Sequence, residues 1–476
     1  MAARPSTHVP SPQPALKRSL RFRDLTLFYI VSGLSVRWVA TAAAAGTSTL
    51  LVWVFALLGF FLPLAGCVLE LSSRYPDEGG LYVWTREAFG DFSGFIAAWT
   101  YWMSNLPFFA SYLYFGAGSV LFIFGARGQH FAGDSRYYLL FTLFWLVVIT
   151  VTNILGANAG KWLNNVCSLG SVVPIGILIV LAVISAAHFG SATSFRPHEL
   201  VPRFSLKNAI FWSTIFFAFG GCEAGSFMGE EIENPRRTIP RALLTGGTIF
   251  AAAYIAGTAA LLVALPSSAV DGVNGFMQGM ATLSARLHVP WLAIPVALLI
   301  GLGSVGGTAA FLSSTSRLPF VAGIDSYLPK VFGSVHPRFR TPWVAIGLYG
   351  LAGMVVGLLG QVGTSVRGAY EVLVSMSILG YFLPYLFLFA SMIRLQKREA
   401  GPNVIRVWGG RPVAVALASI GFLSTALTIV LSVIPSVDET NKALAVAKVL
   451  ISTAVLIGAG VVVFLIAKRK KVRAAA

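Results

Sequence analysis

Long apolar stretches, separated by short polar loops, dominate the pattern of hydrophobic and polar positions along the chain. About 20 consecutive apolar residues are needed for a helix to cross a bilayer. Stretches of about this length predict membrane-spanning helices at 25–47, 49–70, 94–124, 137–156, 166–188, 208–228, 241–265, 290–314, 342–360, 369–393, 412–434 and 444–467. The chain is therefore predicted to be an all-α integral membrane protein with twelve transmembrane helices.

Two of the predicted spans carry features that an ordinary membrane anchor lacks. The sixth span contains FAFGGCEAG, in which Gly220 and Gly221 come shortly before Glu223. A charge in a bilayer costs roughly 2.5–3.5 kcal/mol on insertion scales, and glycines free backbone groups that lipid cannot satisfy. The first span contains SGLSVRW, which combines Gly33 with Arg37. We expect both stretches to line a protected polar cavity.

Composition and charge agree with a membrane protein. Of the 476 residues, 56% are hydrophobic and only 11% are charged, whereas soluble domains carry about 25% charged residues. The net charge of +17 is scattered between apolar runs, so it favours contact with anionic lipid rather than with nucleic acid. Outside the spans, 25 Lys and Arg residues fall on the side that holds both termini, and eight fall on the other. The positive-inside rule then predicts a multi-pass protein of the cytoplasmic (plasma) membrane with both termini cytoplasmic.

The segments outside the spans predict two tails and one short helix. Residues 1–24 are expected to form a disordered basic cytoplasmic tail, and residues 468–476 a second basic cytoplasmic tail. The amphipathic stretch that contains Tyr82 and Trp84 predicts an interfacial helix on the cytoplasmic face. An aromatic belt at the membrane surface is the alternative explanation for these two rings.

The inventory of reactive groups argues against an enzyme. Cys67, Cys167 and Cys222 lie separately in apolar segments, with no spacing typical of a metal site or a disulfide framework. The chain shows no nucleophile–base pair, no phosphate-binding loop and no chain of buried histidines. We therefore predict no catalytic residue, no metal and no cofactor.

Two motifs resemble those of the amino acid–polyamine–organocation transporter family: PDEGGLYVWTREAFGDFSGF, and FAFGGCEAGSFMGEEIENPRRTIPRAL. The resemblance covers nearly the whole chain, and it implies a transport core of ten helices at 25–393, built from two inverted five-helix repeats at 25–188 and 208–393. Two additional helices at 394–467 would follow. The first and sixth helices would be interrupted in mid-membrane and would hold the substrate there. The implied function is secondary active transport of an amino acid or related amine by alternating access, with proton coupling or exchange.

The resemblance places the substrate between the first and sixth helices, with one wall from the third. Backbone amides around Gly33 and Gly221 would meet an anionic group at the positive helix ends. Glu223 would meet a cationic amine or carry a coupling proton. The candidate substrate-binding residues are Ser32, Gly33, Ser35, Arg37, Trp38, Trp102, Asn105, Phe219, Gly220, Gly221, Cys222 and Glu223.

Arg37 departs from the family pattern. The family typically carries a segment of small residues in the first span, whereas here Arg37 and Trp38 occupy that place. Since Arg37 and Glu223 are rare intramembrane charges of opposite sign, we hypothesise that they approach one another across the two breaks. Arg37 could then stand in for the sodium ion that some relatives of this fold bind. Separate solvation of each charge in one vestibule is the alternative.

Other function classes fit the sequence less well. A polyamine uptake carrier is the nearest alternative, and a non-transporting membrane sensor of amino acids is a further one. A pore would need a ring of like polar groups or a filter loop, and no such repeat is visible. The sequence leaves open the substrate, the coupling ion and the oligomeric state.

Overall fold

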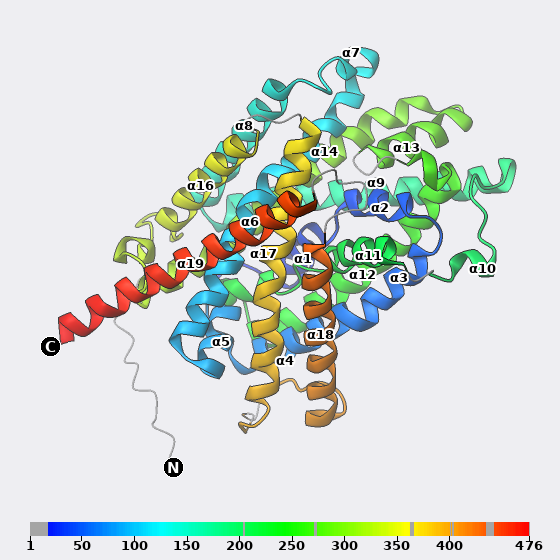
Figure 1. Cartoon of the computed structure of the whole chain (residues 1–476). Helices are drawn as coiled ribbons and strands as arrows, with labels where there is room; N and C mark the ends of the chain where they lie inside the picture. The colour runs from blue at the N-terminus through cyan, green and yellow to red at the C-terminus, as the bar shows by residue number, and fades with distance from the viewer. Residues whose placement is uncertain are drawn as a thin grey trace.

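Helices packed into one bundle make up the described part of the chain (Figure 1). The computed structural model describes residues 18–202, 205–270, 274–361, 366–399, 401, 404–434 and 442–475. Within these residues the only strand-like contact is a two-residue bridge between Leu20 and Ile232. The all-α prediction is confirmed. Most of the predicted N-terminal tail lies outside the described residues, and the first helix begins before the predicted span, at Phe22.

The helices that correspond to the first five predicted spans lie between residues 22 and 189. Their bounds are α1 Phe22–Gly33, α2 Val36–Ala44, α3 Thr49–Ala56, η1 Leu57–Phe61, α4 Leu62–Arg74, α5 Leu81–Phe89, α6 Asp91–Val120, η2 Leu121–Phe124, α7 Gly125–Gln129, α8 Ser135–Ile154 and α9 Ala157–Phe189. The segment η1 is a single π-helical turn that joins α3 to α4 without a break in the helical path.

The helices of the second half follow in the same manner. Their bounds are α10 Pro197–Leu200, α11 Leu206–Ala218, η3 Ala224–Glu231, α12 Pro235–Ala264, η4 Ser267–Ala269, α13 Gly275–Arg286, η5 Pro290–Leu292, α14 Ala293–Thr315, α15 Arg317–Ile324, η6 Lys330–Gly333, α16 Trp343–Gln361 and α17 Val366–Leu395. Two more helices complete the chain, α18 Gly410–Val433 and α19 Lys442–Ala475.

Ten helical stretches in the described residues are long and apolar enough to cross a membrane: Phe22–Ala44, Thr49–Arg74, Asp91–Gln129, Ser135–Ile154, Asn165–Phe189, Pro235–Ala264, Pro290–Gly323, Trp343–Gln361, Met376–Leu395 and Gly410–Ser432. The predicted count of twelve is therefore not confirmed. The span predicted at 208–228 is absent as one helix, because α11 has only 13 residues and stops at Ala218. The span predicted at 444–467 lies within α19, which continues as helix through the predicted basic tail.

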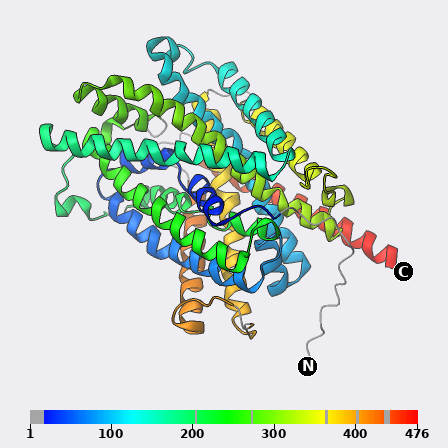
Figure 2. The same cartoon turned by 180° about the vertical axis from the view of Figure 1, so that it is seen from behind.

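Glycine brings two of the long helices together at the level of their backbones. A Cβ atom added to Gly170 on α9 would lie 2.1 Å from the carbonyl oxygen of Leu299 and 2.5 Å from the amide nitrogen of Gly303 on α14. A Cβ atom on Gly306 would lie 2.1 Å from the Cβ atom of Cys167. Small residues permit such close helix packing in membranes. Seen from behind, the blue-green helix α9 runs almost horizontally across the molecule (Figure 2).

The last helix lies along the outside of the bundle (Figure 1). It packs mainly on α6 and also contacts α17. The Trp99 Nε1 group on α6 donates a hydrogen bond to the Leu456 carbonyl oxygen at 2.9 Å. The rings of Phe95 and Phe464 lie 5.6 Å apart. Because α18 and α19 follow the two halves of the chain and pack on their exterior, they leave the interior of the bundle to the preceding helices.

Candidate functional site

The first helix is broken in the middle of its path. It ends at Gly33, and α2 begins at Val36. The intervening residues Leu34 and Ser35 are extended, with φ, ψ of −102°, 114° and −127°, 122°. The Leu34 amide still donates to the Ile30 carbonyl oxygen at 2.8 Å, but the helical pattern ends there, so other groups must satisfy the peptide groups that follow. The predicted interruption of the first helix is confirmed.

The sixth helical segment is broken at the predicted glycine pair. After α11 ends at Ala218, a turn leads to η3, which begins at Ala224. Gly221 has φ of +102°, a conformation that L side chains rarely adopt. A Cβ atom on Gly221 would lie only 3.2 Å from the carbonyl oxygen of Ser32. The two breaks therefore meet, with Gly221 of one against Ser32 of the other.

Tyr254 on α12 satisfies the backbone of both breaks. Its hydroxyl donates to the Gly33 carbonyl oxygen at 2.6 Å and accepts from the Ser35 amide at 3.1 Å. The same oxygen lies 3.3 Å from the Ala218 carbonyl, where α11 ends. Its ring stacks on Trp53 with centroids 4.5 Å apart. Tyr254 thus stabilises the unwound segments through hydrogen bonds to their backbone.

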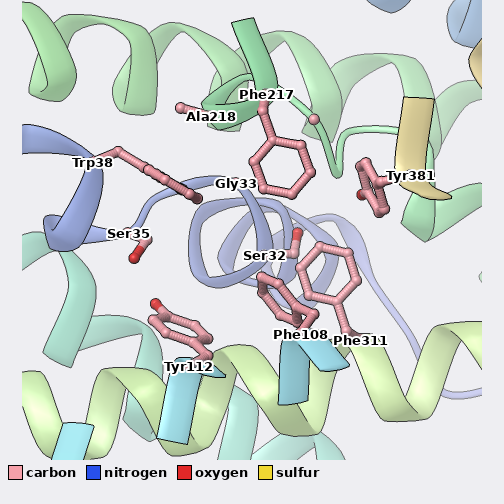
Figure 3. Close-up of a pocket in the computed structure, with 11 residues that line it drawn as sticks. Ser32, Gly33, Ser35, Trp38, Phe108, Tyr112, Phe217, Ala218, Phe311 and Tyr381 are labelled. Carbon is pink, nitrogen blue, oxygen red and sulfur yellow. The ribbon is translucent and has the colours of Figure 1, made fainter. Parts of the chain in front are cut away.

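A pocket lies at the junction of the two breaks (Figure 3). Five of the predicted residues line it: Ser32, Gly33, Ser35, Trp38 and Gly220. The remaining lining residues are Phe108, Tyr112, Phe217, Ala218, Phe311 and Tyr381. In Figure 3 the rings of Phe108, Phe217 and Phe311 gather around the Ser32 side chain. The pocket is therefore mostly aromatic, with polar groups supplied by the broken first helix.

The third predicted span contributes a different wall from the one expected. Trp102 does not line this pocket, and its ring packs instead on Tyr349, with centroids 5.4 Å apart. Asn105 is fully buried and donates from Nδ2 to the Tyr101 carbonyl oxygen at 2.8 Å. The wall is formed by Phe108 and Tyr112, further along α6.

Glu223 lies directly behind the pocket and is completely buried. Its Oε1 atom accepts hydrogen bonds from three tyrosine hydroxyls: Tyr385 at 3.0 Å, Tyr381 at 3.1 Å, and Tyr101. Tyr381 also lines the pocket, so it links the carboxylate to the pocket wall. The second oxygen, Oε2, has no hydrogen-bond partner. Glu223 is thus held firmly at one oxygen and has the other available.

The other predicted residues of the sixth segment lie outside the pocket lining. Phe219 packs against Trp53, with centroids 5.4 Å apart, on the side away from the pocket. Gly221 donates its amide to the Tyr385 hydroxyl at 3.1 Å. Cys222 is a buried free thiol. These three residues support the break and do not face the cavity.

Arg37 is buried among aromatic rings. Its guanidinium carbon lies 4.2 Å from the ring centroid of Trp38, 5.0 Å from that of Tyr112 and 5.1 Å from that of Phe108. No ion pair within 4.0 Å joins it to Glu223, whose partners are tyrosines, so the hypothesised direct contact is not formed in this conformation. Aromatic faces attract the cation but leave its Nε and Nη1 atoms without a hydrogen-bond partner.

The sequence interpretation missed the tyrosines because a phenol in an apolar helix resembles ordinary packing. A periodic signal was nevertheless present on α6, where Tyr101, Asn105, Phe108 and Tyr112 recur at helical spacing and share one face. Trp102 lies one position off that face. This periodicity would have indicated Phe108 and Tyr112 in place of Trp102.

A second cluster of polar groups closes the face of the bundle at which α1 begins, named here the N-terminal face. Arg317 at the start of α15 binds Glu231 at the end of η3, with Nη2 2.6 Å from Oε1. Glu78, between α4 and α5, lies 3.8 Å from the same guanidinium and accepts the Glu230 amide at 3.0 Å. One arginine therefore interacts with two buried carboxylates.

The short helix α5 confirms the predicted helix, but its aromatic residues pack inside the protein. Tyr82 and Trp84 are fully buried, so an aromatic belt does not explain them. Trp84 donates from Nε1 to the Tyr75 carbonyl oxygen at 3.2 Å. Tyr82 and Arg86 both bind the carboxylate of Asp325, which follows α15. The helix α5 thus fastens the N-terminal face to α15.

The cluster around Arg317 predicts a dependence of stability on pH. Burial and the Glu231 carboxylate raise the pKa of Glu78 well above its usual range, although Arg317 opposes the shift. A carboxyl with a raised pKa in the folded state contributes stability below its unfolded pKa and loses it as pH rises through the folded pKa. We expect the melting temperature of the purified protein to fall over that interval, and Glu78→Gln to flatten the fall.

The matched control for this measurement is Glu233→Gln, since Glu233 pairs with Arg21 where both side chains are exposed to solvent. Exposed ion pairs contribute little to stability. The pH profile of that variant should follow the wild type. An equally steep profile in Glu78→Gln would contradict the assignment to Glu78.

Comparison with known proteins identifies the family. The model of the amino acid permease family matches residues 21–460, which is most of the chain. The chain belongs to the amino acid permease family. This family consists of transporters, so the permease is a secondary transporter and not an enzyme. Within the described residues no group of three His, Cys, Asp or Glu side chains could hold a metal ion.

Relatives and a solved structure agree with this assignment. The permease is 24% identical to a probable agmatine/putrescine antiporter of Lactococcus lactis, over 85% of this chain and 87% of the relative. It is 25% identical to a glutamate/gamma-aminobutyrate antiporter of the same species, over 86% and 83%. The crystal structure of MhsT in complex with L-phenylalanine has a TM-score of 0.63 at 15% identity, covering 88% of this chain and all of MhsT. The permease therefore shares the LeuT-like fold, in agreement with the fold predicted from the motifs.

Proposed function

We propose that this permease moves an amino acid or related amine across the plasma membrane by alternating access. The observation that carries the proposal is the pocket at which the two broken helices meet, lined by Ser32, Gly33 and Gly220. Broken helices in transporters of this architecture present unpaired backbone groups and helix ends to the substrate. The aromatic rings around them would exclude water from a small bound molecule.

Glu223 supplies the second part of the proposal. Its unpartnered Oε2 atom is buried beside the pocket and can accept a hydrogen bond from an ammonium group or a proton. Since an isolated buried carboxylate is costly, one of these two partners is expected during each cycle. Glu223 would thus carry either the cationic end of the substrate or the coupling proton.

The relatives support this substrate class. One is an agmatine/putrescine antiporter, and another is a glutamate/gamma-aminobutyrate antiporter. Both exchange small molecules that carry amino groups. We propose exchange or proton symport for this permease, with sodium playing no part.

The orientation belongs to the same proposal. Since Lys and Arg outside the predicted spans gather on the side of both termini, that side would be cytoplasmic. The N-terminal face, with Arg317 and its two carboxylates, would then be the cytoplasmic gate, closed in this conformation. The substrate would reach the cytoplasm only after these ion pairs separate.

Counterflow in proteoliposomes tests the function. Vesicles loaded with one unlabelled amino acid or amine are diluted into the same labelled solute, over a panel that includes L-glutamate, 4-aminobutyrate, L-serine, L-ornithine, putrescine and agmatine. We expect accumulation of at least one member without sodium, at a rate that depends on pH if Glu223 carries a proton. Sodium-dependent uptake would contradict the coupling proposal, and no accumulation of any member would contradict transport of this class.

A further inference from the structure

Arg37 is a buried cation without a counterion; it does not line the pocket itself but lies against three of the rings that do. It is 1% exposed, and its Nε and Nη1 atoms are buried with no hydrogen-bond partner. Within the described residues no carboxylate lies within 4.0 Å of it. Buried charges in proteins are normally paired, because an isolated one loses its hydration. The unused donors on these two nitrogens therefore indicate a partner that is absent from the chain itself.

The rings around Arg37 connect it to the pocket. The three rings that face the guanidinium belong to Trp38, Phe108 and Tyr112, and all three line the pocket. Ser35, which also lines it, has a buried hydroxyl without a hydrogen-bond partner. In Figure 3, Ser35, Trp38 and Tyr112 lie at the same end of the pocket. Unused donors thus gather at one end, next to the start of α2.

We propose that Arg37 binds a carboxylate of the transported substrate and thereby excludes diamines from the site. The planar guanidinium can donate two parallel hydrogen bonds to the two oxygens of a carboxylate. The positive end of the nine-residue helix α2, which begins one residue before Arg37, acts in the same direction. This inference rests on the proposed function and names the chemical group that the site selects.

The same geometry gives the site two chemically opposite ends. Glu223, with one oxygen free, lies on the side of Tyr381, and Arg37 lies on the side of Trp38 and Tyr112. An amino acid offers both signs of charge, so it can satisfy both ends. A diamine can satisfy only Glu223, and its second ammonium group would meet a buried like charge. The site therefore rejects a diamine, because Arg37 would remain without a carboxylate.

Binding to purified full-length protein tests the proposal separately from transport. Affinities are measured by thermal shift for three pairs: L-ornithine with putrescine, L-serine with ethanolamine, and L-glutamate with L-glutamine. The first two pairs differ in the α-carboxylate, and the third differs in the side-chain carboxylate. We expect the carboxylate-bearing member to bind roughly 10- to 100-fold more tightly in at least one pair, as charge-assisted hydrogen bonds would give.

The variant Arg37→Gln should remove most of that preference, and Arg37→Lys should retain part of it, since lysine keeps the charge without the planar fork. Loss in the first two pairs assigns the α-carboxylate, and loss in the third assigns a side-chain carboxylate. The control is Arg338→Gln, because Arg338 lies over Phe339 at 5.6 Å on the exposed surface.

Two results would overturn the proposal. One is a wild-type protein that, in all three pairs, binds the member lacking the tested carboxylate as tightly as its partner. This result does not depend on whether Arg37→Gln folds. The other is a folded Arg37→Gln protein with unchanged preferences in all three pairs. If ligands bind with the expected preference but counterflow is absent, the proposed transport fails and the role of Arg37 stands. If counterflow occurs with unchanged preferences, transport stands and the role of Arg37 fails.

Discussion

Glu223→Gln is expected to lower counterflow by about 100-fold, since it removes the negative charge that would bind an ammonium group or carry the coupling proton. Glutamine keeps the shape of the side chain and an oxygen that can accept from Tyr381 and Tyr385. The fold should therefore persist. The glutamine side chain, however, cannot bind a proton reversibly or attract an ammonium group as a carboxylate does. Initial rates of labelled solute entry into proteoliposomes at matched protein content measure the effect.

Two comparisons sharpen this experiment. Glu223→Asp keeps the charge but shortens the side chain, so it should retain part of the activity while losing contact with the tyrosines. Glu399→Gln makes the same chemical change at an exposed position and should transport as the wild type does. Wild-type rates in Glu223→Gln would remove Glu223 from the transport step, whatever its structural role.

Tyr254→Phe is expected to destabilise the protein by about 2–4 kcal/mol, because it leaves two buried backbone groups without a partner. These groups are the Gly33 carbonyl and the Ser35 amide at the break of the first helix. The ring itself, stacked on Trp53, is retained. The melting temperature of the purified protein should fall, and transport should fall with it, because the break at the pocket loses its support.

Tyr137→Phe serves as the control for this change. Its hydroxyl also donates to a backbone carbonyl, that of Ala117 at 2.9 Å, but the residue is only half buried and lies away from both breaks. Loss of a single ordinary hydrogen bond costs about 0.5–1.5 kcal/mol. Equal melting temperatures for the two variants would show that Tyr254 has no special role at the breaks.

The fold and the position of the site could be predicted from the sequence, because both depend on local signals. Apolar length marks membrane helices, and a glycine pair followed by an acid marks a break within one. The glycine pair indicated the break near Gly220, the family resemblance implied the one near Gly33, and the structure has both there. The ends of the sixth and twelfth predicted spans were harder to predict, because the length of an apolar stretch does not show at which residue a helix stops.

The contacts within the site could not be predicted in the same way, because they join residues far apart in the chain. Opposite charge suggested that Arg37 and Glu223 would pair. Instead, tyrosine hydroxyls from α6 and α17 donate hydrogen bonds to Glu223. Arg37 is surrounded by rings that the pattern of the sequence places in ordinary apolar helices. Hydropathy cannot distinguish a ring that lines a pocket from one that fills a core.

The glycine contacts between α9 and α14 also bear on how the molecule would move. Where Gly170 meets Gly303 and Gly306 meets Cys167, the glycines bring the two helices so close that neither has room to slide or rotate against the other. The pair would therefore act as a stationary frame during transport. Displacements measured between spin labels on α1 or α11 and labels on this pair would then report the motion of the broken helices alone.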